Sequence, residues 1–166
     1  MKKILNFIDG INRILLLLLG VFLSIMIGVL SVQVLSRTLI GHSIPWSEEL
    51  ARFLMIYLVF IGAALALRKQ QLIAIEFVAE KAKFNTRRFL KITSNVIGIV
   101  FFGVIFVQGL EVMARVQTQV SAALQLPMSV VYAALPIGAV LLTMNAIAVI
   151  IELGIASEDK NMEVEK

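Results

Sequence analysis

The side chains most able to do chemistry gather in one short segment, WSEELAR (residues 46–52). Acids in the first turn of a helix oppose its positive end favourably, and Ser47 is a candidate N-cap. Glu48 and Arg52 are four residues apart, so they can form an ion pair on one helix face. Trp46 suits the aromatic belt at a membrane surface. Trp46, Glu48, Glu49 and Arg52 are an unusually dense group for the edge of a bilayer, and they form the candidate site.

The sequence offers no constellation for catalysis or metal binding. His42 is the single histidine and has no ligand cluster beside it, so it makes neither a metal site nor a triad. The absence of cysteine excludes thiolate ligands and nucleophiles. The alternative, an enzyme acting on lipid, has only His42 with Glu48 and Glu49 as candidate residues. We predict no catalytic residue, no metal site and no cofactor.

The composition indicates that the bilayer is the natural solvent of this chain. Of its 166 residues 60% are hydrophobic and only 16% are charged, and the mean hydropathy is +0.95. The charges are clustered, and a helix of about 20 apolar residues crosses the hydrocarbon core. We predict an all-α integral membrane protein with four transmembrane helices, at about residues 12–37, 47–69, 88–115 and 128–153.

Two of these expected helices are irregular. Only 15 uncharged residues separate Arg52 from Arg68 in the second helix, which is about 22 Å of helix. That helix spans only if both arginines snorkel outward or if Arg52 is paired. In the fourth helix, Pro136 has no N–H for the carbonyl of Tyr132, so we expect a kink there.

The connection between the second and third helices alternates apolar and charged side chains. This pattern suits a short interfacial amphipathic helix at about residues 72–83, and a solvated loop is the alternative. Residues 1–156 then form a single four-helix membrane domain, and residues 157–166 form a polar cytoplasmic tail.

Small residues recur at helical spacing in the first and fourth helices. Such faces let helix backbones approach closely, and they suit packing within the chain or against a partner equally well. The candidate helix-packing face consists of Gly20, Ser24, Gly28 and Ser31 in the first helix and of Ala134 and Gly138 in the fourth.

The distribution of lysine and arginine predicts the orientation. Twelve of these residues lie in the N-terminal arm, the central connection and the C-terminal tail, whereas Arg37, Arg52 and Arg115 lie on the other side. Because positive residues favour the cytoplasmic side, both termini are expected in the cytoplasm.

The same residues flank apolar spans and form no continuous basic face, so the net charge of +4 does not indicate nucleic acid binding. The uncharged stretch of 23 residues, Ile14–Ser36, is longer than a signal peptide core and favours a retained first helix.

Three stretches of the sequence resemble the small membrane subunit of tripartite ATP-independent periplasmic (TRAP) transporters, within a likeness that covers about residues 5–153. The first stretch runs from residues 46–52 into residues 60–68. The second is residues 72–76, where the family tends to place a histidine shortly before an acid. This chain has Gln71 at the histidine position, so no role for that histidine is carried over. The third is residues 121–127, followed by Tyr132 and residues 135–138.

The resemblance implies a bacterial inner-membrane protein that works with partners. In this family a periplasmic binding protein captures an organic acid, and a large membrane subunit of about twelve helices holds the sodium and substrate sites. That large subunit moves elevator-fashion, and the small permease subunit resembles its static scaffold. The implied partners are the large subunit, the periplasmic binding protein and membrane lipids, without nucleic acid. Residues 46–52 would then brace the chain against the large subunit or the binding protein.

A second function remains open from the sequence. The alternative is an autonomous small membrane carrier or channel that works as an oligomer. Such a protein is expected to carry an acid deep in the bilayer, because a buried charge is costly and is retained for function. The predicted spans contain no ionisable group near their middle. This pattern favours the partner-dependent scaffold.

Overall fold

The computed structural model describes residues 2–39, 41–42, 44–70 and 84–164, and within these residues it is helical, without strands. Four of the helices are long and apolar enough to cross a membrane, which confirms the predicted all-α membrane fold. The interfacial helix expected at residues 72–83 lies outside the described residues. The helices are α1 (Lys2–Leu39), α2 (Pro45–Arg68), α4 (Phe84–Arg115), α5 (Met128–Tyr132) and α6 (Ala134–Val164).

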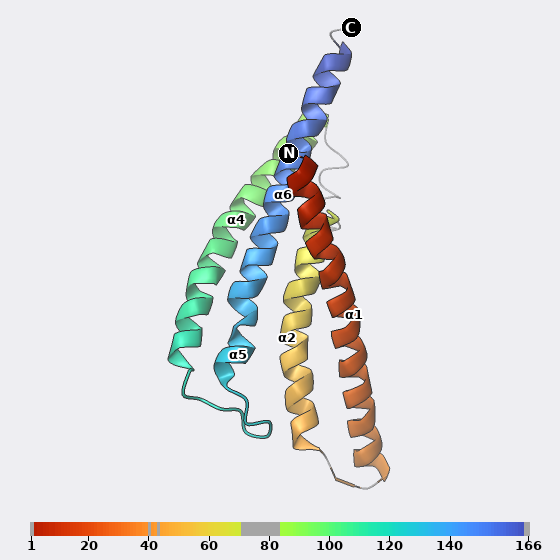
Figure 1. Cartoon of the computed structure of the whole chain (residues 1–166), viewed down its shortest axis with the longest axis vertical. Helices are drawn as coiled ribbons and strands as arrows, with labels where there is room; N and C mark the ends of the chain where they lie inside the picture. The colour runs from red at the N-terminus through yellow and green to blue at the C-terminus, as the bar shows by residue number, and fades with distance from the viewer. Residues whose placement is uncertain (1, 40, 43, 71–83, 165–166) are drawn as a thin grey trace.

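The long helices stand side by side in the order α4, α6, α2 and α1, and the start of α1 leans across toward α6 (Figure 1). Both termini lie at one end of the molecule, which we call the termini end (Figure 1). The α1–α2 connection and the α4–α5 loop lie at the opposite loop end. Of the most apolar stretch of each helix, half is buried in α6 and 28% in α2, but only 6% in α1 and in α4. The structure therefore has a covered centre and two largely uncovered flanking helices.

The start of α2 differs from the expectation at Ser47. The N-cap residue is Ile44, and Pro45 takes the first helical position, where its missing N–H costs nothing. Ser47 is 1% exposed, and its hydroxyl donates to the carbonyl of Ile44 at 2.7 Å. The prediction that Ser47 caps the helix is wrong, because the helix begins two residues earlier.

The fourth span consists of two helices. The short α5 ends at Tyr132, and α6 begins at Ala134 and continues into the polar tail as far as Val164. Pro136, the third residue of α6, has no N–H to donate to the carbonyl of Tyr132. Regular bonding resumes one residue later, where the N–H of Ile137 donates to the carbonyl of Ala133 at 3.1 Å.

The two sets of small residues have different surroundings. Ala134 is 1% exposed, and a Cβ atom added at Gly138 would overlap the Cβ and ring atoms of Phe60. The small residues of α6 thus allow α2 to approach closely. By contrast, Cβ atoms added at Gly20 or Gly28 would meet nothing within 4 Å, and Ser24 and Ser31 are exposed. The described part of the chain leaves the small-residue face of α1 uncovered.

These surroundings predict opposite effects of the same substitution on stability. Gly138→Ala should lower the free energy of unfolding by about 1–3 kcal/mol, because overpacking displaces Phe60 and the α2 backbone. Gly20→Ala is the matched control, since it gains the same helix propensity in open space. The measurement is unfolding of the purified protein in detergent, followed by circular dichroism. Equal stability of the two variants would contradict the packing described for α2 and α6.

Candidate functional site

Glu49 connects α2 with the α4–α5 loop at the loop end. Its carboxylate accepts hydrogen bonds from three successive backbone N–H groups, those of Ala122 at 3.1 Å, Ala123 at 2.9 Å and Leu124 at 2.8 Å. Successive N–H groups that point to one anion form a nest, and hydrogen bonds to a charged acceptor are stronger than neutral ones. Glu49 therefore fixes this loop against the start of α2.

The loop is shaped to present those N–H groups. Ser121 and Leu126 close a turn, because the N–H of Ser121 donates to the carbonyl of Leu126 at 2.9 Å and the Leu126 N–H donates to the Ser121 hydroxyl at 3.2 Å. Gln125 within this turn has a φ of 54°, in the left-handed region. Below the turn, the N–H of Met128 donates to the carbonyl of Gln119 at 2.9 Å. The turn and Glu49 together give the loop a defined conformation.

Glu48 is engaged with α1 rather than with its own helix. Its carboxylate accepts a hydrogen bond from the side-chain amide of Gln33 at 2.6 Å. The expected ion pair between Glu48 and Arg52 is wrong for the described structure, which holds no such pair. Gln33 is 8% exposed and Glu48 is exposed, so this bond joins α1 and α2 at a partly buried position.

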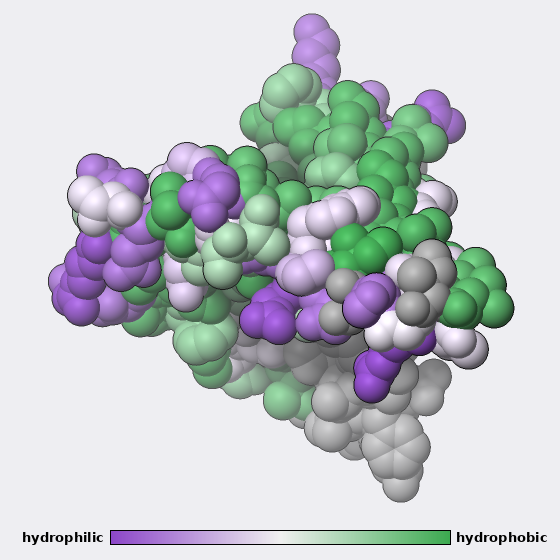
Figure 2. Space-filling model, turned by 90° about the horizontal axis from the view of Figure 1, so that it is seen from below, coloured by the Kyte–Doolittle hydropathy of each residue, from purple (hydrophilic) through white to green (hydrophobic). Residues whose placement is uncertain are grey.

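The four predicted site residues thus divide into two pairs. Glu48 and Glu49 point to other parts of the same chain and hold α1, α2 and the α4–α5 loop together. Trp46 is 44% exposed, and Arg52 is exposed without an ion pair in the described part of the chain. Figure 2, viewed from the loop end, shows hydrophilic residues gathered over the tips of the helices and hydrophobic surface along the flanks. Trp46, Glu48 and Arg52 are all exposed, and of these only Glu48 forms a side-chain hydrogen bond within the described residues.

A second polar cluster, at the termini end, was not predicted as a unit. The guanidinium of Arg68 donates to both carboxylate oxygens of Glu152, at 2.7 and 2.6 Å, and to Asp9 at 2.9 Å. These bonds join α2 to α6 and to α1. The second span has a short apolar length, and these bonds neutralise the charge of Arg68 at one of its ends. Arg52, at the other end, is exposed. The sequence placed all three residues at helix ends but gave no signal of their proximity.

A buried amide pair lies one turn further into the membrane. Asn12 and Asn145 donate to each other's side-chain oxygens at 2.7 and 3.0 Å, and Asn145 also donates to the carbonyl of Ala64 at 2.9 Å. Asn12 is 7% exposed and Asn145 is fully buried. An interhelical role was expected for Asn145, whereas Asn12 lay at the edge of the first span and was missed. The pair fixes the relative position of three helices in a region without water.

None of these polar clusters resembles a catalytic centre. Within the described residues, no three histidine, cysteine, aspartate or glutamate side chains come close enough to hold a metal ion. His42 is exposed, and its backbone carbonyl accepts a hydrogen bond from Ser36. The polar groups of the chain instead join helices to one another and to a loop. The fold and the site define a multi-pass membrane protein whose described polar contacts hold its own helices and a loop together.

Comparison with known proteins identifies the family. Residues 26–154 match the family described as tripartite ATP-independent periplasmic transporters, DctQ component. This match covers most of the chain, and the chain belongs to the DctQ component family of TRAP transporters. It is accordingly a multi-pass protein of the bacterial inner membrane.

Three relatives show the extent of the likeness. The chain is 30% identical over 111 residues to the sialic acid TRAP transporter small permease protein SiaQ of Vibrio cholerae, covering 67% of this chain and 61% of the relative. It is 29% identical over 110 residues to the C4-dicarboxylate TRAP transporter small permease protein DctQ of Rhodobacter capsulatus, covering 65% and 48%. It is 32% identical over 96 residues to the sialic acid TRAP transporter permease protein SiaT of Haemophilus influenzae, covering 58% and 15%. The chain thus spans less than two thirds of the length of each of these relatives.

The Glu49 contacts predict a local effect at the loop end. Glu49→Ala should speed amide hydrogen exchange at Ala122, Ala123 and Leu124 severalfold, because it removes the charged acceptor of all three N–H groups. Hydrogen exchange measured by mass spectrometry reports this opening. Glu111→Ala is the control, because it removes a carboxylate that pairs with Arg115 on the surface. Unchanged exchange in Glu49→Ala would show that the turn keeps its conformation without the Glu49 contacts.

Proposed function

We propose that this chain is the small permease subunit of a sodium-driven TRAP transporter that imports an organic acid. It acts as a static membrane scaffold for the large elevator-type subunit, and a periplasmic binding protein delivers the substrate. The names of the relatives, for sialic acid and for C4-dicarboxylates, support an organic acid as the substrate class.

One observation carries the scaffold role, namely the unequal covering of the helices. α6 is half buried along its most apolar stretch, while α1 and α4 are 6% buried, so two membrane-length faces remain for other helices or lipid. The face of α1 that carries Gly20 and Gly28 has open space at both glycines. Small residues on such a face allow a partner helix to approach closely.

The position of the polar groups supports a subunit that does not itself move ions. Inward of the charged helix ends, no span carries an aspartate, glutamate, lysine, arginine or histidine, whereas ion-coupled carriers place such groups near the middle of the bilayer. The polar contacts of Glu48, Glu49 and Arg68 lie near the two ends and hold the helices to one another. A body fixed at both ends suits a support for a moving partner.

The loop end is the proposed docking side. With both termini in the cytoplasm, as the lysine and arginine distribution favours, the loop end faces the periplasm, where a binding protein would arrive. Trp46 and Arg52 are exposed there, and tryptophan and arginine are enriched among residues that dominate binding energy. In this proposal, Glu48 and Glu49 hold the surface in place and Trp46 and Arg52 contact the partner.

The test is reconstitution with the co-expressed large subunit and binding protein. The chain alone in proteoliposomes with a sodium gradient should give background uptake of organic acids, and the three-part system should give uptake. Gly28→Leu should reduce co-purification of the large subunit, because it fills the open face of α1 without touching the chain itself. Arg52→Ala should weaken docking by about fivefold or more if it is a dominant contact.

The controls separate assembly from folding. Arg115→Ala removes another exposed arginine at the same end, one that is paired with Glu111, and should leave docking unchanged. Both Gly28→Leu and Arg52→Ala should unfold like the wild-type chain in detergent. Robust uptake by the chain alone would refute the scaffold role. Normal assembly and transport by both variants would show that neither the open face of α1 nor Arg52 contributes to the proposed interfaces.

The orientation has its own test. Alkaline phosphatase fused after residue 155 should be inactive, because the C-terminus is expected in the cytoplasm, where the enzyme does not fold into its active form. The same enzyme inserted near Gly41, at the loop end, should be active. An active C-terminal fusion would contradict both the orientation and the periplasmic docking surface.

A further inference from the structure

Two cations at the termini end of α4 have no anionic partner among the residues that the structure describes. Lys91 is 9% exposed, and its ammonium donates to the neutral amide oxygen of Gln70 at 2.5 Å. Arg88, one turn earlier, has a buried Nε atom without a hydrogen-bond partner. Within the described residues neither side chain forms an ion pair. A sheltered cation without an anion is costly, so this position is suited to a negatively charged group from outside the chain.

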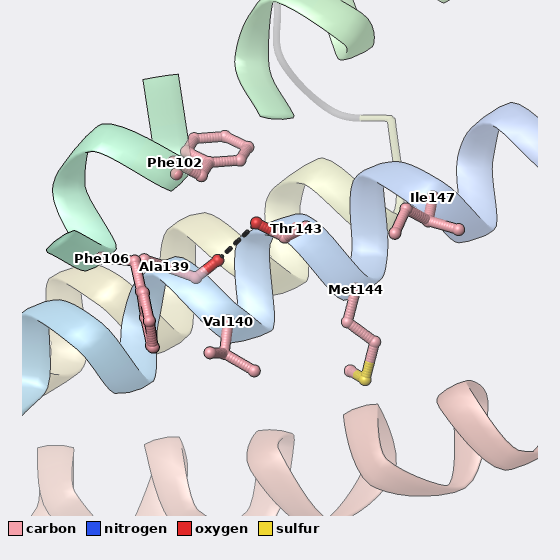
Figure 3. A pocket seen from close by; sticks show the side chains of 8 residues that line it. Phe102, Phe106, Ala139, Val140, Thr143, Met144 and Ile147 are labelled. Atoms are coloured by element: carbon pink, nitrogen blue, oxygen red, sulfur yellow. Dashed lines mark hydrogen bonds between the residues drawn. The ribbon is translucent and has the colours of Figure 1, made fainter. Parts of the chain in front are cut away.

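An apolar hollow of about 470 Å³ lies between α4 and α6, closer than the two cations to the middle of α4. Phe102 and Phe106 reach it from α4, opposite the α6 side chains (Figure 3). The hydroxyl of Thr143 donates to the carbonyl of Ala139 at 2.8 Å, so it is engaged within α6 (Figure 3). The hollow therefore suits hydrocarbon. Its lining residues are Phe102, Gly103, Phe106, Ala139, Val140, Thr143, Met144 and Ile147.

The cations and the hollow lie on the same face of α4. Arg88 and Phe106 are 18 residues apart, which is about five helical turns, and Lys91 and Phe102 are 11 apart, about three turns. From Arg88 to Phe102 the helix rises by about 21 Å. Half of a bilayer with its headgroups is about 20–22 Å thick. A cation at headgroup level is thus separated from the hollow by about the depth of one lipid leaflet.

We propose that this chain binds one anionic phospholipid along the seam between α4 and α6. The phosphate would lie at Arg88 and Lys91, and one acyl chain would extend along α4 into the hollow. Basic positions between transmembrane helices on the cytoplasmic side are suited to anionic headgroups. Charge complementarity and matched length favour a lipid over an apolar side chain of a partner helix, because such a side chain in the hollow would leave both cations unpaired.

The test uses the full-length chain purified in mild detergent and incubated with phosphatidylglycerol or phosphatidylcholine. Native mass spectrometry should show one phosphatidylglycerol retained per chain and little phosphatidylcholine. Arg88→Gln with Lys91→Gln should weaken retention by about 30-fold, at about fivefold for each charge removed. The charge-preserving pair Arg88→Lys with Lys91→Arg should retain the lipid, which separates loss of charge from loss of fold.

A second pair of variants tests the hollow. Val140→Trp fills it and should reduce retention of phosphatidylglycerol at least as much as the loss of one charge. Val107→Trp is the matched control, because Val107 is 61% exposed on α4 outside the hollow, and it should retain the lipid. Equal retention of the two lipids by the wild-type chain would overturn the proposal. Retention of phosphatidylglycerol in both the glutamine pair and Val140→Trp would overturn it as well.

Discussion

The contacts of Arg68 with Asp9 and Glu152 are the interaction on which the arrangement of three helices depends. The Arg68 side chain is 12% exposed, so its charge is largely withdrawn from water and needs both carboxylates. Removing one partner of an ion pair leaves the remaining charge uncompensated, and water at the partly exposed Asp9 and Glu152 carboxylates reduces the cost below that of a fully buried pair. Since the three residues come from α2, α1 and α6, that cost fixes the termini end of all three helices at once.

From the termini end to the loop end, the contacts between the helices change from polar to apolar and then to polar again. Asn12 and Asn145 lie next to the arginine cluster, and beyond them Gly138 lets α2 and α6 approach through Phe60. The loop end is then held by Gln33 with Glu48 and by Glu49 with its three N–H donors. The interior is therefore fixed at both ends and packed between them. This arrangement uses only one side of α1 and α4, and the uncovered sides follow directly from it.

The sequence predicted the helices well because their apolar length is a local property. It also identified Glu48, Glu49 and Arg52 as unusual at a membrane edge, and it expected an interhelical role for Asn145. It could not predict which residues meet, because Gln33 competes with Arg52 for Glu48 only once α1 and α2 lie side by side. Likewise, the three N–H groups that surround Glu49 are more than seventy residues away in the chain and carry no side-chain signal.

The division between Glu49 and Arg52 separates two kinds of constraint on neighbouring positions. Glu49 accepts hydrogen bonds from three N–H groups of its own chain, so a substitution there alters the loop whatever lies outside it. Arg52 is exposed and forms no ion pair within the described residues, so a substitution there alters only the surface that an outside molecule meets. The conformation of the loop and the chemistry of the surface beside it can therefore change independently.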